Sequence, residues 1–203
     1  MKSILSKLSH KRAVSILLGE SEVILSRSVL TPFGPTIVDR VSESIEHERV
    51  EVVLAKLLEQ FKTQRAQRSI PTVVGLSTLR VFFSTRQCNA LNRAATPQVQ
   101  LHEMLKSSTL NIDDMEVDMI RHQPGKNQVA GIVACQKKAL VPILDVLKEQ
   151  GIQPIRVEPA PCALLREAIR RHKSPKKSKL VLRMFLGAES ALAVLTANDF
   201  PLF

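Results

Sequence analysis

The segment 129–168 constrains the fold most strongly, because two extended apolar stretches alternate in it with two amphipathic ones. Residues 129–135 (VAGIVAC) are short, apolar and rich in β-branched side chains, which is typical of a buried strand. Apolar residues then recur at helical spacing in 140–147, and Gly151 follows where a left-handed helix end is expected. A second strand over 152–159 and a second helix over 162–172 complete the pattern. A helix between two strands requires a crossover, so this segment predicts an α/β layer.

The rest of the chain predicts further strands around one long helix. Two β-rich runs, 13–18 and 22–30, are joined by the turn GESE and predict a hairpin. Helical periodicity over 44–68 predicts the longest helix, and strands follow at 72–77 and 79–85, with Phe82 and Phe83 on opposite faces. A short helix after Pro97, a strand over 115–121 and a hairpin turn over 123–128 lead back to 129–135.

This order predicts an interrupted architecture. Residues 1–12 form a basic N-terminal tail, and 13–78 together with 159–172 form the first subdomain. Between these two parts, 79–158 form an inserted β-α-β-β-α-β module. Residues 173–178 are a linker, and 179–203 begin a second subdomain with another hairpin and the start of a third strand. Because an isolated hairpin is not stable, we expect it to pack on the first half or to leave an edge open for a partner.

Composition limits the chemistry. A formal charge of +10 favours an anionic neighbour, which could be nucleic acid, an acidic protein or the inner leaflet of a bacterial membrane, but it also fits a simply soluble basic surface. The three cysteines have no C-x-x-C spacing, and two lie in apolar segments, so we expect reduced, buried thiols. The scattered histidines predict no metal site, and no nucleophile elbow or Walker loop indicates a catalytic residue.

Two stretches of the sequence echo each other: SILLGESEVILSR near the start and RMFLGAESALAVL near the end. Each consists of an apolar strand, a glycine turn and a second strand. Two such hairpins, with a module inserted in the first half, resemble the actin-like (ribonuclease H-like) ATPase superfamily, which implies an α/β fold. GIVACQKKALVPILDVLKEQGIQPIRVEPAPCALLREA, VVGLSTLRVFFSTRQ and FLGAESALAVLTANDFPLF are similar to segments of the PilM family of type IV pilus assembly. The cytoplasmic domain of the type II secretion protein GspL is a related match. Since 179–203 is shorter than that family's second half, we expect a truncated second half.

The sequence departs from this resemblance at the residues that would hold nucleotide. ATP-binding members carry Asp-x-Gly in both hairpins, where the Asp acts through Mg²⁺ or water. The matching triplets here are Leu17-Leu18-Gly19 and Phe185-Leu186-Gly187. The corresponding loops are Gly19, Glu20 and Ser21, and Gly187, Ala188, Glu189 and Ser190. Their glutamates would repel phosphate by about 1–4 kcal/mol at effective dielectric constants of 80 to 20. We therefore expect no ATP hydrolysis and no bound cofactor, with ATP binding as the open alternative.

The resemblance implies a non-catalytic scaffold that docks inner-membrane components of a type IV pilus or type II secretion machine. It implies a cytoplasmic location at the inner face of the membrane, and a PilN-like peptide bound in a groove between the first subdomain and its module. That groove would be lined by Leu79, Val81 and Phe83. The basic surface and the basic start of the chain also fit contact with anionic lipid. Two alternatives remain open: an actin-like ATPase with altered phosphate loops, and a basic nucleic-acid-binding module whose affinity would fall steeply with salt.

Overall fold

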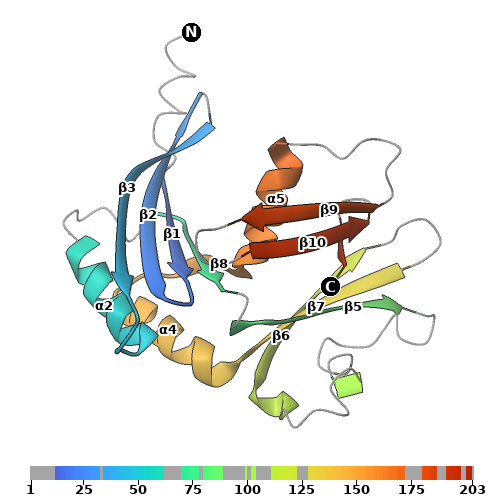
Figure 1. The fold of residues 1–203 in the computed structure, drawn as a ribbon. Helices are drawn as coiled ribbons and strands as arrows, with labels where there is room; N and C mark the ends of the chain where they lie inside the picture. Colours follow the sequence, from blue (N-terminus) through green and yellow to red (C-terminus); the bar gives the residue numbers. More distant parts are fainter. Residues whose placement is uncertain are drawn as a thin grey trace. The chain divides into compact units, whose positions relative to one another are not determined.

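The computed structural model (Figure 1) describes residues 12–32, 34–61, 70–77, 80–88, 99, 102–103, 111–122, 128–171, 180–186, 191–197 and 200–202. Its internal contacts divide the chain into two units. The first unit comprises Met1–Ser77 and Leu140–Ala160, and the second comprises Thr78–Ala139 and Pro161–Phe203. Each unit therefore contains two separate stretches of the sequence.

A five-stranded sheet forms the centre of the first unit. In the order β3-β2-β1-β4-β8, its strands are β3 (Gly34–Ser44), β2 (Glu22–Thr31), β1 (Arg12–Leu18), β4 (Thr72–Leu76) and β8 (Pro154–Pro159). The first three strands form an antiparallel meander. β4 runs parallel to β1 on its other side, and β8 runs parallel to β4.

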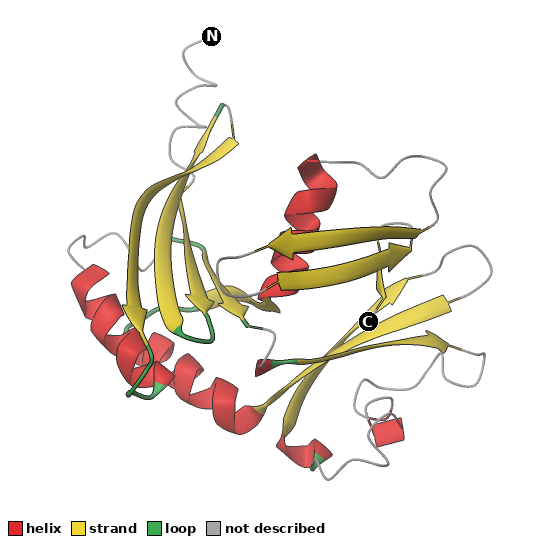
Figure 2. Ribbon diagram, viewed as in Figure 1, coloured by secondary structure: helices red, strands yellow, loops and turns green. Residues whose placement is uncertain are grey.

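Helix α2 (Val50–Phe61) covers part of this sheet (Figure 2). Its apolar residues recur at the spacing of one helical face, and this face is buried while the charged face remains in solvent. The helix contacts β2 and β3. The guanidinium of Arg27 on β2 lies 4.6 Å from the centre of the Phe61 ring, which shows which face of β2 meets the helix. The core of this unit consists largely of Val14, Ile16, Leu18, Val23, Leu25, Val53, Leu54, Leu57, Leu58 and Phe61.

Helix α4 (Lys137–Glu149) ends as the sequence predicts. Gly151 has φ = 70°, a left-handed conformation that glycine adopts without steric cost. Its N–H donates to the carbonyl of Lys148 at 2.9 Å, and the N–H of Ile152 donates to the carbonyl of Leu147 at 2.8 Å. These two hydrogen bonds form a Schellman motif, which satisfies carbonyls at the helix end and leads the chain into β8.

The second unit contains two three-stranded antiparallel sheets and helix α5 (Ala160–Arg171). One sheet has the order β5-β7-β6, with β5 (Phe82–Cys88), β7 (Gln128–Gln136) and β6 (Met115–His122). The other has the order β11-β10-β9, with β11 (Phe200–Leu202), β10 (Ala191–Ala197) and β9 (Leu180–Leu186). The Thr85 hydroxyl of β5 donates to the carbonyl of Pro201 on β11 at 3.4 Å. Phe82 packs against buried Met115, Ile132 and Ala134.

Several predicted elements agree with the structure. The two hairpins are β1–β2 and β9–β10, and the third strand expected near the end is β11. The long helix is α2, which begins at Val50, later than predicted, while the end of the predicted range 44–68 lies outside the described residues. Phe82 and Phe83 have different surroundings, as expected for neighbours on a strand. Of the helix predicted after Pro97, only Val99, His102 and Glu103 are described, and all three are helical.

One strand is not predicted, and one prediction is wrong. No sequence pattern indicates strand β3, because most of its residues are exposed and it therefore lacks an apolar period. The strand–helix–strand segment 129–159 does not cross over within one sheet, since β7 pairs with β5 and β6 while β8 pairs with β4. The internal contacts of the structure group 140–158 with the first sheet and 161–171 with the second unit, whereas the predicted domains group 79–158 together and 159–172 with 13–78.

Candidate functional site

The carboxyl ends of β1, β4 and β8 lie at one edge of the first sheet, where ligands of parallel α/β sheets usually bind. The register pairs Leu18 with Leu76 and Leu76 with Pro159, so all three strands end at the same level. The β1–β2 turn, which contains Gly19, Glu20 and Ser21, begins at this edge. The N–H of Ser77, directly after β4, donates to the carbonyl of Leu18 at 3.0 Å and ties the two strand ends together.

The Gly19 backbone closes the hairpin. Its N–H donates to the carbonyl oxygen of Glu22 at 2.9 Å. A Cβ atom at position 19 would lie 2.6 Å from that same oxygen, closer than real Cβ atoms come. The carbonyl of Ser21 accepts the N–H of Ile45 at 2.8 Å and thereby joins the turn to the residue after β3. The steric demand of the turn therefore accounts for glycine at this position without any ligand.

Apolar side chains occupy the positions at which the sequence resemblance would place an aspartate and its neighbour. Leu18 is fully buried in the core, while Leu17 is half-buried on the other face of β1. The Cδ1 atom of Leu17 lies over Gly75 of β4, 3.2 Å from the point where a Cβ on that glycine would be. Neither leucine supplies an oxygen ligand for Mg²⁺, and the exposed Glu20 is the acidic residue of the turn itself.

The structure places only one of the two predicted loops. Gly187, Ala188, Glu189 and Ser190 lie outside the described residues. Their flanking strands are described, and β9 and β10 pair from Leu186–Ala191 to Leu180–Ala197 as an antiparallel hairpin. The site expected from the two hairpins therefore consists, in the described part of the chain, of the first turn alone.

Sequence reasoning missed Ser77. Its side chain is buried at the edge formed by β1 and β4, and its hydroxyl has no hydrogen-bond partner in the described structure. An unsatisfied buried hydroxyl costs free energy, so such a group requires an explanation. The only sequence signal was its position at the end of the β-branched run TVVGL.

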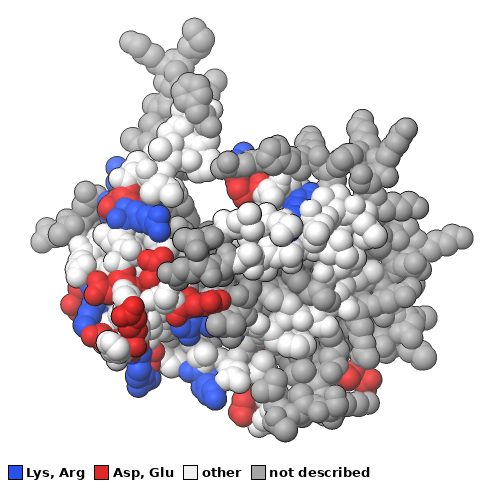
Figure 3. Space-filling view, viewed as in Figure 1, with Lys and Arg blue, Asp and Glu red and all other residues white. Residues whose placement is uncertain are grey.

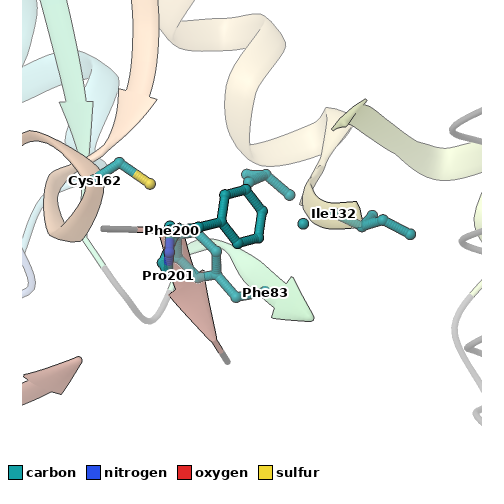
Figure 4. Close-up of a pocket in the computed structure, with 7 residues that line it drawn as sticks. Phe83, Ile132, Cys162, Phe200 and Pro201 are labelled. Carbon is teal, nitrogen blue, oxygen red and sulfur yellow. The ribbon is translucent and has the colours of Figure 1, made fainter. Parts of the chain in front are cut away.

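The residues predicted to line a partner groove are partly described. Leu79 lies outside the described residues, whereas Val81 and Phe83 are both half-buried. Phe83 lines a small apolar pocket of about 10 Å³ together with Ile132, Cys162, Phe200 and Pro201 (Figure 4). A space of this size holds at most about one water molecule. The pocket lies within the second unit and, in this conformation, is too small for a peptide side chain.

Charge is unevenly distributed along the chain. Ten of the 29 Lys and Arg residues fall in the segments 1–11, 62–69 and 172–179, which lie outside the described residues. Acidic and basic side chains mix on the visible face of the first unit, whereas the surface over β9 and β10 is largely uncharged (Figure 3). The described surface therefore shows no uniformly basic face in this view.

The described titratable groups offer little further chemistry. Burial raises the pKa of the half-buried Cys135 thiol, and the nearby Glu116 carboxylate raises it further, so this thiol is neutral at pH 7. Within the described ranges, no cluster of three or more His, Cys, Asp or Glu residues could hold a metal ion. In the same part of the chain, no helix is long and apolar enough to cross a membrane.

Comparison with known proteins agrees with this topology. No family model and no curated protein matches the sequence. Among solved structures, a PilM–PilN type IV pilus biogenesis complex matches 94% of this chain and 60% of that chain, with 20% identity and a TM-score of 0.68. A Bacteroides thetaiotaomicron protein of unknown function, described as having an actin-like ATPase fold, matches 98% of this chain and 70% of that chain with a TM-score of 0.56 and 13% identity. The chain has the actin-like ATPase fold.

A third solved structure has a similar fold. The cytoplasmic domain of EpsL, an inner membrane component of the Vibrio cholerae type II secretion system, matches 94% of this chain and 70% of that chain, with 13% identity and a TM-score of 0.59. The resemblance to PilM and to the secretion protein is thus confirmed at the level of the fold. The chain spans about 60% of the PilM structure that it matches.

Proposed function

We propose that this protein is a non-catalytic scaffold with an actin-like fold, which binds the cytoplasmic peptide of an inner-membrane protein in a type IV pilus or type II secretion machine. It would act at the cytoplasmic face of the inner membrane. The fold likeness to the PilM–PilN complex supports this class of partner, and the likeness to the cytoplasmic domain of EpsL, an inner membrane component, supports the location. The identity to both structures is 20% or less, and a binding experiment therefore tests the proposal.

The absence of a carboxylate from the Leu17-Leu18-Gly19 triplet carries the non-catalytic part of the proposal. Nucleotide-hydrolysing sites hold Mg²⁺ through oxygen ligands, and the metal bridges and neutralises the phosphates. Here Leu17 packs over Gly75 and Leu18 is buried, so the edge of the sheet offers hydrocarbon at these positions. The Gly19 N–H is already used in closing the hairpin. The first turn is therefore suited to holding the hairpin rather than to orienting phosphate.

Peptide binding is tested by fluorescence anisotropy with the full chain. The probe is a labelled synthetic peptide that copies the N-terminal cytoplasmic segment of the PilN-type inner-membrane protein encoded nearest to this protein. We expect saturable binding with little dependence on salt, because an apolar groove contributes no counterion release. Phe83→Leu should weaken binding, since Phe83 is half-buried on the predicted groove strand. Ile37→Ala, which changes a side chain that is 63% exposed on β3, is the matched control.

Three results would contradict the proposal. Absence of binding to such a peptide would remove the scaffold function. Calorimetry that detects micromolar, Mg²⁺-dependent ATP binding would favour an ATPase with altered loops. Binding of nucleic acid with an affinity that falls steeply as salt rises would favour the nucleic-acid-binding alternative.

A further inference from the structure

The hairpin of β2 and β3 extends beyond the described start of β1 (Figure 1). β1 begins at Arg12, which pairs with Val29 of β2. The pairing of β2 with β3 continues past this level to the pair of Thr31 and Gly34, at the end of the sheet opposite the β1–β2 turn. In the described part of the first unit, the end of this hairpin is therefore a two-stranded ribbon.

The tip of this hairpin, residues 30–32 and 34–38, exposes apolar side chains. Ile37 is 63% exposed, Val38 is 56% exposed and Leu30 is 37% exposed. The sequence from 28 to 38 contains no Lys, Arg, Asp or Glu. Exposed apolar side chains that gather in one place on a soluble protein indicate an interaction site.

Charge is segregated along the same three strands. Residues 13–25 and 41–46, toward the β1–β2 turn, contain four glutamates and neither Lys nor Arg. Toward the hairpin tip, Arg12 and Arg40 are both exposed. The acidic residue at this end, Asp39, lies 3.9 Å from a third arginine and forms an ion pair with it. The end of the sheet that exposes apolar side chains is thus also its basic end.

The spacing of these groups fits the interface of a lipid bilayer. Interfacial segments bury their apolar side chains about 5–10 Å into the boundary between headgroups and acyl chains. β3 is an edge strand, so Ile37 and Val38 can enter a bilayer first. Arg40 lies three residues along β3 from Ile37 and Arg12 lies two strands away, and both separations are about 10 Å. Both arginines therefore reach the headgroups when Ile37 and Val38 are covered by lipid.

The edge of β3 is poorly suited to pair with a strand of another protein. The register of β2 with β3 shifts between Arg27 and Ser28, which leaves Val38 without a partner on β2. Such a bulge disrupts and twists an edge, and Pro35 has no N–H to donate to a neighbouring strand. A lipid surface accepts apolar side chains without a backbone ladder, so it fits this edge better than a strand does.

We propose that the hairpin tip inserts Ile37 and Val38 into a bilayer that contains anionic lipid. Arg12 and Arg40 bind the lipid headgroups, which attract cations. Lipid contact deepens the membrane location proposed above and rests on it, whereas peptide binding does not require it.

A single tryptophan reports insertion, because the chain has no Trp or Tyr of its own. Ile37→Trp is mixed with vesicles of equal parts phosphatidylcholine and phosphatidylglycerol, with or without bromine on the acyl chains, which quenches tryptophan inside the bilayer. Ile155→Trp is the matched control, since Ile155 is 69% exposed on β8 of the same sheet. We expect a blue shift and quenching for Ile37→Trp and neither for Ile155→Trp. Vesicles of phosphatidylcholine alone should bind the chain about tenfold more weakly.

Glutamate variants test the contribution of the tip to affinity. Ile37→Glu should lower the affinity of the full chain for the anionic vesicles about tenfold in co-sedimentation, because it places a charge among the inserted apolar side chains. Ile155→Glu makes the same change in net charge and should lower the affinity less than about twofold. Both side chains are largely exposed, so both variants should fold, and circular dichroism checks this.

Several outcomes would overturn lipid insertion by the tip. These are no binding of the wild type to anionic vesicles, quenching of both tryptophans or of neither, and equal losses of affinity for the two glutamate variants. A dimer of the lipid-free chain that Ile37→Glu dissociates would also overturn it, because a second copy would then cover the tip. The vesicles contain no protein, so any of these results leaves the peptide-binding proposal standing. Ile37→Glu should still bind the PilN-type peptide in lipid-free solution, which supports two separate contacts.

Discussion

Replacing Gly19 by alanine tests whether the steric demand of the hairpin, rather than a ligand, requires glycine in the first turn. The added Cβ would lie 2.6 Å from the carbonyl oxygen of Glu22, which also accepts the Gly19 N–H at 2.9 Å. Since this oxygen belongs to the backbone, it cannot turn away as a side chain would. The hairpin must open at this point, and the hydrogen bond that closes it must lengthen.

The expected loss follows from two opposing effects. Overpacking of a well-packed site costs about 1–3 kcal/mol. Alanine restricts the unfolded chain relative to glycine, which returns about 0.4–1 kcal/mol. We therefore expect Gly19→Ala to lower the free energy of unfolding by about 1–2 kcal/mol.

Urea unfolding followed by far-ultraviolet circular dichroism measures this loss, because the chain has no Trp or Tyr for fluorescence. The midpoint should fall while the m-value stays constant. Gly75→Ala is the matched control. A Cβ at that position would meet the Cδ1 atom of Leu17 at 3.2 Å, which is the end of a flexible side chain and can move. The control should change stability by less than about 1 kcal/mol.

Equal midpoints for Gly19→Ala and Gly75→Ala would refute the steric argument. Glycine at position 19 would then need another explanation, such as the close approach of a ligand to the backbone. A changed m-value would mean that the substitution altered the denatured state or the cooperativity of unfolding, and the comparison of midpoints would no longer support the steric argument.

Two further predictions concern the cores of the two units. Leu57→Ala in α2, where Leu57 is fully buried, should lower the free energy of unfolding by about 2–5 kcal/mol, whereas Lys56→Ala on the exposed face should cost less than about 1 kcal/mol, as urea midpoints would show. An equal effect of both substitutions would contradict the described burial of α2. The raised pKa of Cys135 means that the folded state favours the neutral thiol. The contribution of this thiol to folding stability is therefore fully present below the ordinary thiol pKa and is lost as the pH rises through the raised pKa. When the pH is raised from 7.5 to a value above the raised pKa of Cys135, the urea midpoint should therefore fall more for the wild type than for Cys135→Ala. An identical pH dependence of the two proteins would contradict the raised pKa.

Local sequence signals predicted where helices and strands lie better than they predicted which strands pair with one another. Gly151 marked the end of α4, and the alternation around Phe82 and Phe83 placed the two rings in different surroundings. β8 was assigned to the wrong sheet because its pairing with β4 joins residues that are distant in the sequence, and no local pattern encodes such a choice. β3 was missed for a related reason: as an exposed edge strand, it has no apolar face to give a period of two.

The sequence indicated where the first hairpin turn lies but not how its backbone is bonded. The glycine of the turn and the absence of an aspartate were visible in Leu17-Leu18-Gly19, whereas the use of the Gly19 N–H within the turn and the burial of Ser77 required coordinates. The exposed face of β9 was hidden in the sequence as well. LVLRMFL is apolar at six of its seven positions, so its two faces look alike until the fold buries one of them.

The pairing of β4 with β8 has a consequence for how the protein is made. Thr72–Leu76 is synthesised long before Pro154–Pro159, and the second unit's β5, β6 and β7 lie between them in the sequence. During translation, the four strands available first would form a sheet whose β4 edge has no neighbour, and such edges recruit strands from other chains. Parallel pairing across so large a separation is also slow, because loop-closure entropy opposes it. We therefore expect the nascent chain to be vulnerable to aggregation until β8 leaves the ribosome.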